Sequence, residues 1–379
     1  MPGFTSHDDF IKQVTVNNRF FRCDWNKLFN PTAAAVAGEW HSLFRGAGNP
    51  TADALLNTGT ALAFQSVSFS TTNATGLYTG GDVGSTLASI AWARSGTTIT
   101  VTSTAHGLAV GDGINVTVSS DTSAIPVNLY LVTAVTDANT FTFTGVNAGG
   151  SSGTITYVPP AFKTAINASA FSAAATTMPA VALLIDILGF YRVTGVTTTT
   201  AQSTTVSTGA GPYLPRYSSG RGVQAFFVNS NATALGAGTP NLSIGYTNQD
   251  GTQSRATPAT LPIGKTGATN SHILYSGTGS GKYGPFVPLQ AGDSGIRSIQ
   301  TIQNSTSYVS GEYSVVLCKP IFSLPMTTLG VPAERDLVNQ VPSFPRIYDG
   351  ACLTWLLYSG AATPASSPFY GHIDFGWGQ

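Results

Sequence analysis

The most restrictive feature of this chain is a run of alternating segments between residues 89 and 158. Residues 99–102 and 113–118 alternate apolar with polar side chains, and residues 131–144 do the same through Val132, Phe141 and Phe143. A period of two is the pattern of a half-buried β-strand. Turn-forming residues stand between the segments, as at positions 111–112 and 137–139. The pattern predicts a small β-barrel-like module that is inserted into a larger protein.

The rest of the chain predicts a mainly β body. Residues 222–251 contain two apolar segments, and positions 248–251 (Asn-Gln-Asp-Gly) indicate a hairpin after the second. Residues 197–211 are low in complexity, which indicates an exposed loop or an edge segment. Short strands at this spacing favour an antiparallel β-sandwich or jelly-roll-like body. Expected strands lie at residues 61–69, 180–191, 222–228, 241–246, 296–301, 313–320, 351–358 and 370–377.

The first 54 residues differ from the body and predict an N-terminal arm with short helices. Ser6 followed by Asp9 indicates a helix cap. Residues 23–29 and 38–44 each place Trp, Leu and Phe at i, i+3 and i+4, which is one face of a helix. The arm either packs on the chain's own body or docks on a neighbouring subunit. In the second case the interface candidates are its aromatic residues: Phe20, Phe21, Trp25, Trp40 and Phe44.

These segments predict three parts. They are the arm (1–54), a body assembled from residues 55–88 and 159–379, and the inserted module (89–158).

Charge is scarce and balanced. Lys+Arg and Asp+Glu both number 17, and charged residues make up 9% of the chain, against an average of about 25%. A net charge of zero is unfavourable for a free soluble protein and is typical of a component of an assembly. Without a basic excess, nucleic acid is not an expected partner. The apolar run at 180–191 contains Asp186 and is shorter than the ~20 residues of a membrane span, so no membrane partner is expected.

Several fragments imitate enzyme motifs without completing them. Residues 292–295 (Gly-Asp-Ser-Gly) match the start of the nucleophile segment of chymotrypsin-like proteases, but Ile296 follows where that motif continues with Gly. The one histidine segment that echoes this family contains His106, which lies inside the inserted module. Residues 276–283 resemble a phosphate loop, but Tyr283 stands where a Ser or Thr hydroxyl would bind Mg²⁺. Both fragments are interpreted as turns.

His372 and Asp374 flank Ile373, so both side chains point to one face of the expected last strand. This arrangement is compatible with a metal pair, a catalytic dyad or a hydrogen-bonded pair at an interface. No third metal ligand lies close in the sequence. We therefore expect no catalytic residue, no cofactor and no bound metal.

The three cysteines lack metal-binding spacing. Cys318 and Cys352 lie in apolar segments, and Cys23 lies in the arm. Buried, reduced thiols are the expectation, with a cross-link between Cys318 and Cys352 as the alternative.

The strings described so far resemble a known class of protein. The module at 89–158 is similar to the FCCH-like or Ig-like insertions of tailed-bacteriophage virion proteins. Residues 285–298, 333–340, 345–355 and 369–378 look like tailed-phage virion structural proteins, in which such a chain lies beside the major capsid protein as a decoration or cement component. The chain departs from the major capsid protein itself because it has no long charged spine helix.

The resemblance implies a non-enzymatic virion protein, assembled in the host cytoplasm, that stabilises the capsid shell. Its expected partners are the major capsid protein and copies of itself. A fibre, spike or tail component that binds a host surface glycan is the alternative, although such fibres have long β-repeats that this body lacks. A polysaccharide hydrolase is a further alternative. It would need an acidic cleft, whereas the three Glu residues, at positions 39, 312 and 334, are scattered.

Overall fold

A computed structural model gives the architecture of the chain. The structure describes residues 6–29, 37–44, 48–49, 54–57, 64–66, 75–77, 87–106, 108, 110, 112–158, 162–172, 180–193, 195–203, 214, 216–217, 219–229, 234–258, 271–274, 284–339, 345–348, 351–364 and 366–377. The fold is mainly β, as predicted, and every strand pairing between its named strands is antiparallel. No helix within those ranges combines the length and apolar character needed to cross a bilayer.

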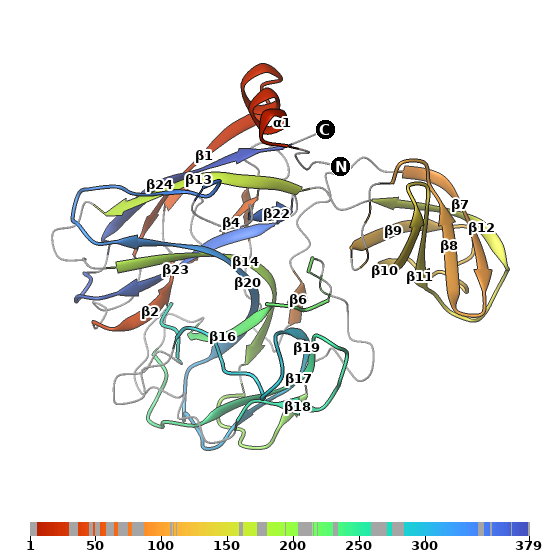
Figure 1. The fold of residues 1–379 in the computed structure, drawn as a ribbon. Coiled ribbons are helices and arrows are strands. Elements are labelled where there is room, and N and C mark those ends of the chain that lie inside the picture. The colour runs from red at the N-terminus through yellow and green to blue at the C-terminus, as the bar shows by residue number, and fades with distance from the viewer. Residues whose placement is uncertain are drawn as a thin grey trace.

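The body contains three sheets, which we name the upper, central and lower sheets after their places in Figure 1. The upper sheet has the order β21 (Ala333–Asp336), β13 (Phe162–Ser172), β24 (Pro368–Gly376), β1 (Phe20–Leu28) and β3 (Gly48–Asn49), with β22 (Arg346–Tyr348) paired to β13. The central sheet has the order β16 (Gln224–Asn229), β20 (Tyr313–Met326), β14 (Ala180–Val193), β23 (Cys352–Ser359), β4 (Ala54–Asn57) and β5 (Phe64–Ser66). Strands β2 (Glu39–Ser42) and β6 (Thr75–Leu77) pair with β23 and β14. The lower sheet has the order β15 (Gln202–Ser203), β19 (Ile296–Asn304), β17 (Leu242–Asn248) and β18 (Arg255–Ala256).

Apolar side chains fill the spaces between these sheets. Leu184, Trp355 and Ile373 belong to a buried cluster shared by the central and upper sheets. Phe227 and Tyr246 belong to a second cluster, shared by the central and lower sheets. Ile185 and Ile187, which point to the opposite face of β14 from Leu184, belong to a third buried cluster. The central sheet is therefore buried on both faces, which explains the nearly continuous apolar run of β14.

A β-bulge changes which residues of β14 face the upper and lower cores, which lie along one side of this strand. Ala182 and Leu184 face the upper core. The pairing with β20 then shifts between Ile187 and Gly189, so the intervening residue has no direct partner. One extra residue reverses which face each later side chain occupies. As a result the odd-numbered Tyr191 and Val193 join Leu188 in the lower core, instead of sharing the opposite face with Ile185 and Ile187.

The inserted segment forms a closed six-stranded barrel, drawn at the right of Figure 1. Its order is β10 (Asn128–Asp137), β11 (Thr140–Thr144), β8 (Thr98–Thr102), β7 (Leu87–Ser95), β12 (Ser152–Val158) and β9 (Gly113–Ser119). Its core contains Ile99, Val101, Phe141 and Phe143, the apolar members of the alternating segments. That the barrel is a separate domain remains a prediction.

Of the helical segments predicted for the arm, the first is confirmed, whereas those at residues 23–29 and 38–44 are wrong. Helix α1 (His7–Ile11) begins at Ser6, whose Oγ accepts a hydrogen bond of 3.0 Å from the Asp9 N–H, and continues into the π-helical turn η1 (Lys12–Val16). Residues 23–29 and 38–44 instead contribute to strands β1 and β2. In β1 the buried side chains recur at every second residue, at Cys23, Trp25 and Lys27. The segment therefore fits a period of two as well as 3.6, and a nine-residue ladder with β24 decides for the strand.

Two further expectations are confirmed. Cys23, Cys318 and Cys352 are all free and buried, and burial raises the pKa of the Cys23 thiol to about 12. Strands β17 and β18 form the predicted hairpin, in which the Asn248 N–H donates to the Thr252 carbonyl at 3.0 Å.

Residues 197–201 are exposed and lead into β15 at the edge of the lower sheet, while the rest of the predicted loop lies outside the described residues.

Candidate binding groove on the upper sheet

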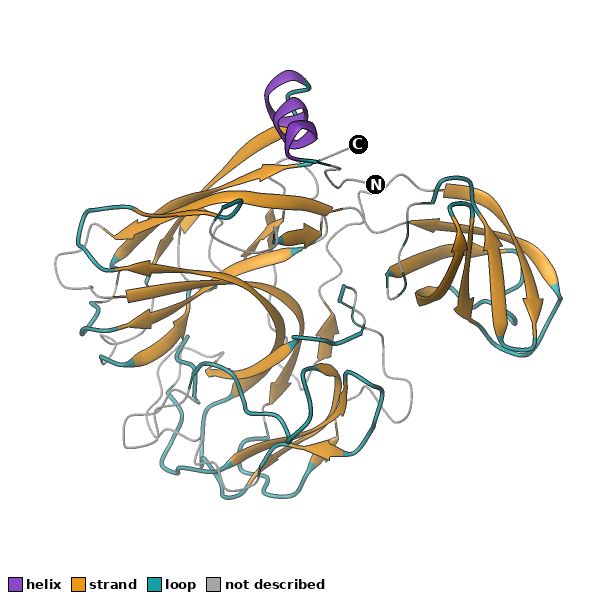
Figure 2. Cartoon of the chain, viewed as in Figure 1, coloured by secondary structure: helices purple, strands orange, loops and turns teal. Residues whose placement is uncertain are grey.

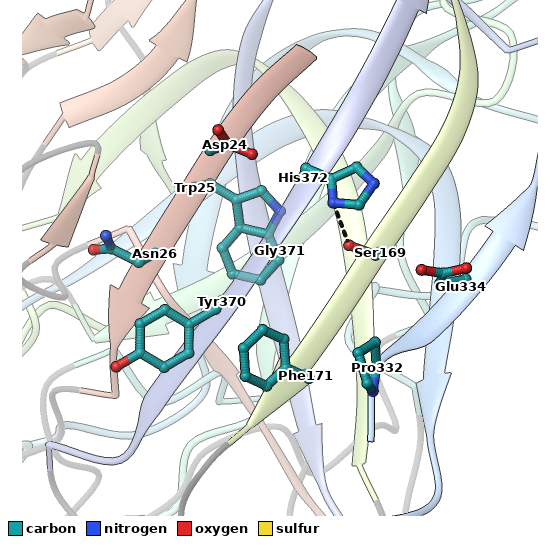
Figure 3. Close-up of a pocket in the computed structure, with 10 residues that line it drawn as sticks. All are labelled: Asp24, Trp25, Asn26, Ser169, Phe171, Pro332, Glu334, Tyr370, Gly371 and His372. Atoms are coloured by element: carbon teal, nitrogen blue, oxygen red, sulfur yellow. Dashed lines mark hydrogen bonds between the residues drawn. The ribbon is translucent and has the colours of Figure 1, made fainter. Parts of the chain in front are cut away.

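The solvent-facing side of the upper sheet carries an open groove of about 430 Å³ (Figure 3). It crosses strands β1, β24, β13 and β21. The strand register places Asp24 opposite His372, His372 opposite Ser169, and Ser169 opposite Glu334. These four polar side chains form one row across the sheet because directly paired residues share a face. The complete lining is Asp24, Trp25, Asn26, Ser169, Phe171, Pro332, Glu334, Tyr370, Gly371 and His372.

Beneath the groove, a glycine allows the Trp25 ring to pack against strand β24 on the core side of the sheet. A Cβ atom on Gly371 would lie 2.8 Å from Trp25 Cε2 and 2.0 Å from the Ser169 carbonyl oxygen, so any larger residue would collide with both. The indole of Trp25 is 3% exposed and packs against Trp355, with ring centroids 4.8 Å apart. The sheet under the groove therefore packs directly on the core of the body.

One end of the groove is aromatic. Phe171 and Tyr370 are paired across β13 and β24, and their rings stack at 5.2 Å with an interplanar angle of 26°. Tyr370 is 37% exposed, so part of its ring is available to a ligand. Figure 3 shows both rings beside the polar row. The combination offers apolar faces next to carboxylate, amide and imidazole groups.

The predicted same-face placement of His372 and Asp374 is confirmed, but the two are not bonded to each other. The Ser169 Oγ lies 2.7 Å from His372 Nδ1, whereas His372 Nε2 is 3.8 Å from Asp374 Oδ2, beyond hydrogen-bond range. Arg22 binds both oxygens of Asp374, at 2.8 and 2.9 Å. This hydrogen bonding raises the pKa of the Arg22 guanidinium above its ordinary value.

Ser169, His372 and Asp374 lie near one another, but they do not form a catalytic triad. A triad needs its acid on the imidazole to orient it, and here that carboxylate is neutralised by Arg22. Ser169 lies in a strand that is paired on both sides, so the backbone N–H groups around it are used by the ladders.

The acidic residues of the groove are too widely spaced for glycoside hydrolysis. Asp24 and Glu334 are separated by three inter-strand steps. At about 4.8 Å per step their Cα atoms lie roughly 14 Å apart. Paired glycosidase carboxyl groups are about 5–9.5 Å apart. The groove therefore supports binding better than hydrolysis.

The predicted interface aromatics are spread over several surroundings. Trp25 and Phe44 are buried in two different core clusters of this chain. Trp40 is half-buried against Tyr358, with ring centroids 5.4 Å apart, and Phe20 is 37% exposed. The side chain of Phe21 lies outside the described residues. A contact of any of the five with another subunit remains a prediction.

The protease-like segment is a structural turn, as interpreted from the sequence, and its important residue is Asp293. This carboxylate accepts hydrogen bonds from Tyr246 Oη at 2.6 Å, Asn248 Nδ2 at 2.8 Å and Arg255 Nε at 2.9 Å. The hydrogen bonds from Arg255 lower its pKa to about 2.

Of the other two enzyme-like fragments, the structure describes the one that contains His106. His106 lies within the barrel segment, where its Nδ1 accepts from the Leu108 N–H at 3.0 Å. Residues 276–283 lie outside the described residues.

The groove itself was not predicted. Ser169 stands between Ala168 and Ala170, which belong to the core, and this alternation of polar with apolar residues indicates a β-strand. The sequence contains no signal for which strands lie beside it.

Comparisons with known proteins identify no family. No family model matches the chain, and no curated protein matches it. Infectious bursal disease virus VP2, solved as a subviral particle, is 11% identical with a TM-score of 0.15, over 78% of this chain and 80% of that one. VP1 of the trichodysplasia spinulosa-associated polyomavirus, solved with sialylated glycooligomers, is 10% identical with a TM-score of 0.12, over 77% of this chain and 98% of that one. Similarities at these scores carry no argument about function.

Proposed function

We propose that this chain is a structural virion protein that binds and stabilises a phage capsid shell as a cement or decoration protein. Its partners are the major capsid protein and further copies of itself. The observation that carries the proposal is the helical segment at residues 7–16, which places no apolar side chain in the core of its own chain.

This segment presents apolar groups to solvent. Within residues 7–16 the one buried side chain is that of Gln13, while Ile11 is 45% exposed and Val16 is 73% exposed. Phe20, at the start of β1, is 37% exposed. Helices this short are marginal in water unless an apolar face is packed. Figure 2 shows the segment, in purple, projecting beyond the upper sheet, where a partner subunit would cover it.

Charge contributes little to the proposed contact. Buried or half-buried acids are used within the chain, as in the pairs Arg22–Asp374, Arg216–Asp186 and Arg255–Asp293. With 9% charged residues, the chain has few groups left for long-range attraction. We therefore expect apolar burial to dominate capsid binding, with weak dependence on salt.

The double variant Ile11→Ser with Val16→Ser tests the proposal. Covering the exposed parts of these side chains is worth about 2–3 kcal/mol together, which corresponds to a roughly 30- to 150-fold weaker Kd in the variant. Co-sedimentation with capsids that lack this protein measures the loss at low and high salt. Circular dichroism should show an unchanged fold.

A matched control uses exposed valines of the barrel. Val118 and Val127 are 58% and 56% exposed, so Val118→Ser with Val127→Ser removes similar apolar area. The control should bind capsids like the wild type. Equal binding by both variants, or steep loss of wild-type binding with salt, would contradict the proposal. The copy number in purified particles should match the shell lattice rather than a single vertex.

A second candidate function is glycan binding by a fibre, spike or tail component. The observation that favours it is the groove, where the stacked rings of Phe171 and Tyr370 lie beside Asp24, Asn26 and Glu334. Sugar rings pack their apolar faces on aromatic rings and hydrogen-bond to such polar groups. A host polysaccharide titration should show binding that Tyr370→Ala abolishes. The Ile11/Val16 variant should retain it, which separates the two functions.

A further inference from the structure

We propose that Glu39, His41 and His272 form a binding site for one Zn²⁺ ion, which fastens the segment at residues 271–274 to strand β2. Each side chain offers one ligand atom, and these atoms all lie within 4.8 Å of one another. The proposal is independent of the groove and of the capsid contact. It departs from the metal-free protein that the sequence predicts.

The backbone brings the three residues together. Glu39 and His41 are two positions apart in β2, so they share a face of that strand. His41 is bridged in antiparallel fashion to His272. The Ile273 N–H donates to the Trp40 carbonyl at 3.0 Å, and the Ser42 N–H donates to the Ser271 carbonyl at 2.8 Å. The ligands are therefore held by paired strands on a rigid frame.

The distances suit a tetrahedral ion. Glu39 Oε2 and His272 Nδ1 are 3.3 Å apart. Two ligands at about 2.0–2.2 Å from a common Zn²⁺ lie roughly 3.4 Å from each other at the tetrahedral angle. The rings of His41 and His272 meet edge to face at 77°, with centroids 4.8 Å apart, so neither ring covers the other. The other distances between the three ligand atoms are no greater than 4.8 Å.

Burial gives the cluster a reason to take up a cation. Glu39 and His41 are each 1% exposed, and His272 is 2% exposed. A carboxylate in the interior is costly unless a positive charge accompanies it. Zn²⁺ would place a positive charge beside the Glu39 carboxylate and bind all three groups at once. Two imidazoles and one carboxylate are a donor set that Zn²⁺ accepts readily.

The cluster packs against an aromatic ring of the core. Phe29 packs edge-on against His41, with ring centroids 4.9 Å apart, so the site belongs to the protein interior. Three protein ligands leave one tetrahedral position, which a water molecule would occupy.

The experiment uses the untagged full-length protein, stripped with EDTA and then titrated with ZnCl₂. Mass spectrometry under native conditions should show one Zn²⁺ per chain, and the melting temperature should rise on addition. His272→Gln should weaken Zn²⁺ binding by at least about 100-fold, since even outer-shell changes cost 10- to 100-fold. His372→Gln is the matched control, because it removes a histidine outside the cluster, and it should bind Zn²⁺ like the wild type.

A second measurement on the wild type covers the case in which His272→Gln does not fold. Co²⁺ in place of Zn²⁺ should show the visible absorption of a tetrahedral ion with nitrogen and oxygen ligands. A thiolate charge-transfer band would instead assign the ion to a cysteine and overturn the proposal. Absence of uptake by the folded wild type, or equal uptake by folded His272→Gln, would also overturn it.

Discussion

Replacement of Trp25 by Ala decides whether this residue is a core residue or an interface anchor. The side chain is 3% exposed and packs on Trp355. Truncation of a buried Trp usually costs about 3–5 kcal/mol. The Nε1 of Trp25 is buried with no hydrogen-bond partner among the residues that the structure describes, and its removal offsets about 1 kcal/mol of that loss. We therefore expect Trp25→Ala to lower the free energy of unfolding by about 2–4 kcal/mol.

Urea denaturation followed by far-UV circular dichroism measures this change. Trp25→Phe is the matched control, because it keeps an aromatic ring over Trp355 and removes the unbonded N–H. It should cost less than about 1.5 kcal/mol. A stability of Trp25→Ala within about 1 kcal/mol of the wild type would refute the core assignment. If that stable variant also failed to bind capsids, Trp25 would be an interface anchor after all.

Three further outcomes are expected. Arg216→Met should destabilise the protein by about 3–5 kcal/mol in thermal or urea unfolding, because it leaves the fully buried Asp186 carboxylate without its cation. Arg22→Met is the control: Arg22 is half-exposed in its pair with Asp374, so its replacement should cost less than about 1 kcal/mol. The pKa of the Asp293 carboxyl group is lowered from 3.8 to about 2 in the folded protein, so its ionised form should stabilise the fold above pH 3.8. This stabilisation should be lost as the pH falls towards 2. Asp293→Asn should therefore flatten that part of an acid-unfolding curve. Replacing residues 87–158 by a Gly-Ser linker should leave a cooperative melting transition for the body, and loss of that transition would show that the barrel is part of the core.

Local signals in the sequence were sufficient for many elements. The alternation at residues 99–102 and 140–144 predicts strands that the barrel contains, with Phe141 and Phe143 in its core. Asn248 and the residues after it predict a hairpin through turn chemistry, and Ser6 predicts a helix cap. These features depend on neighbours within a few residues, so the chain determines them without knowledge of the whole fold.

Short segments that satisfy two periods could not be assigned in this way. Trp25 and Trp40 stand in patterns that fit a helix face, yet both lie in strands. Four or nine residues are too few for periodicity to separate the two structures, and tertiary pairing with β24 and β23 decides.

The sequence by itself determined the β character of the chain, the alternating barrel strands and the burial of its thiols, because these follow from side-chain type and local spacing. Only the tertiary structure decided which side chains meet. The row from Asp24 through His372 and Ser169 to Glu334 depends on the register of four strands from distant parts of the chain. The cluster of Glu39, His41 and His272 likewise exists because one short segment pairs with β2. Strand order and register are set by the packing of whole sheets, and that information is not carried by any single segment.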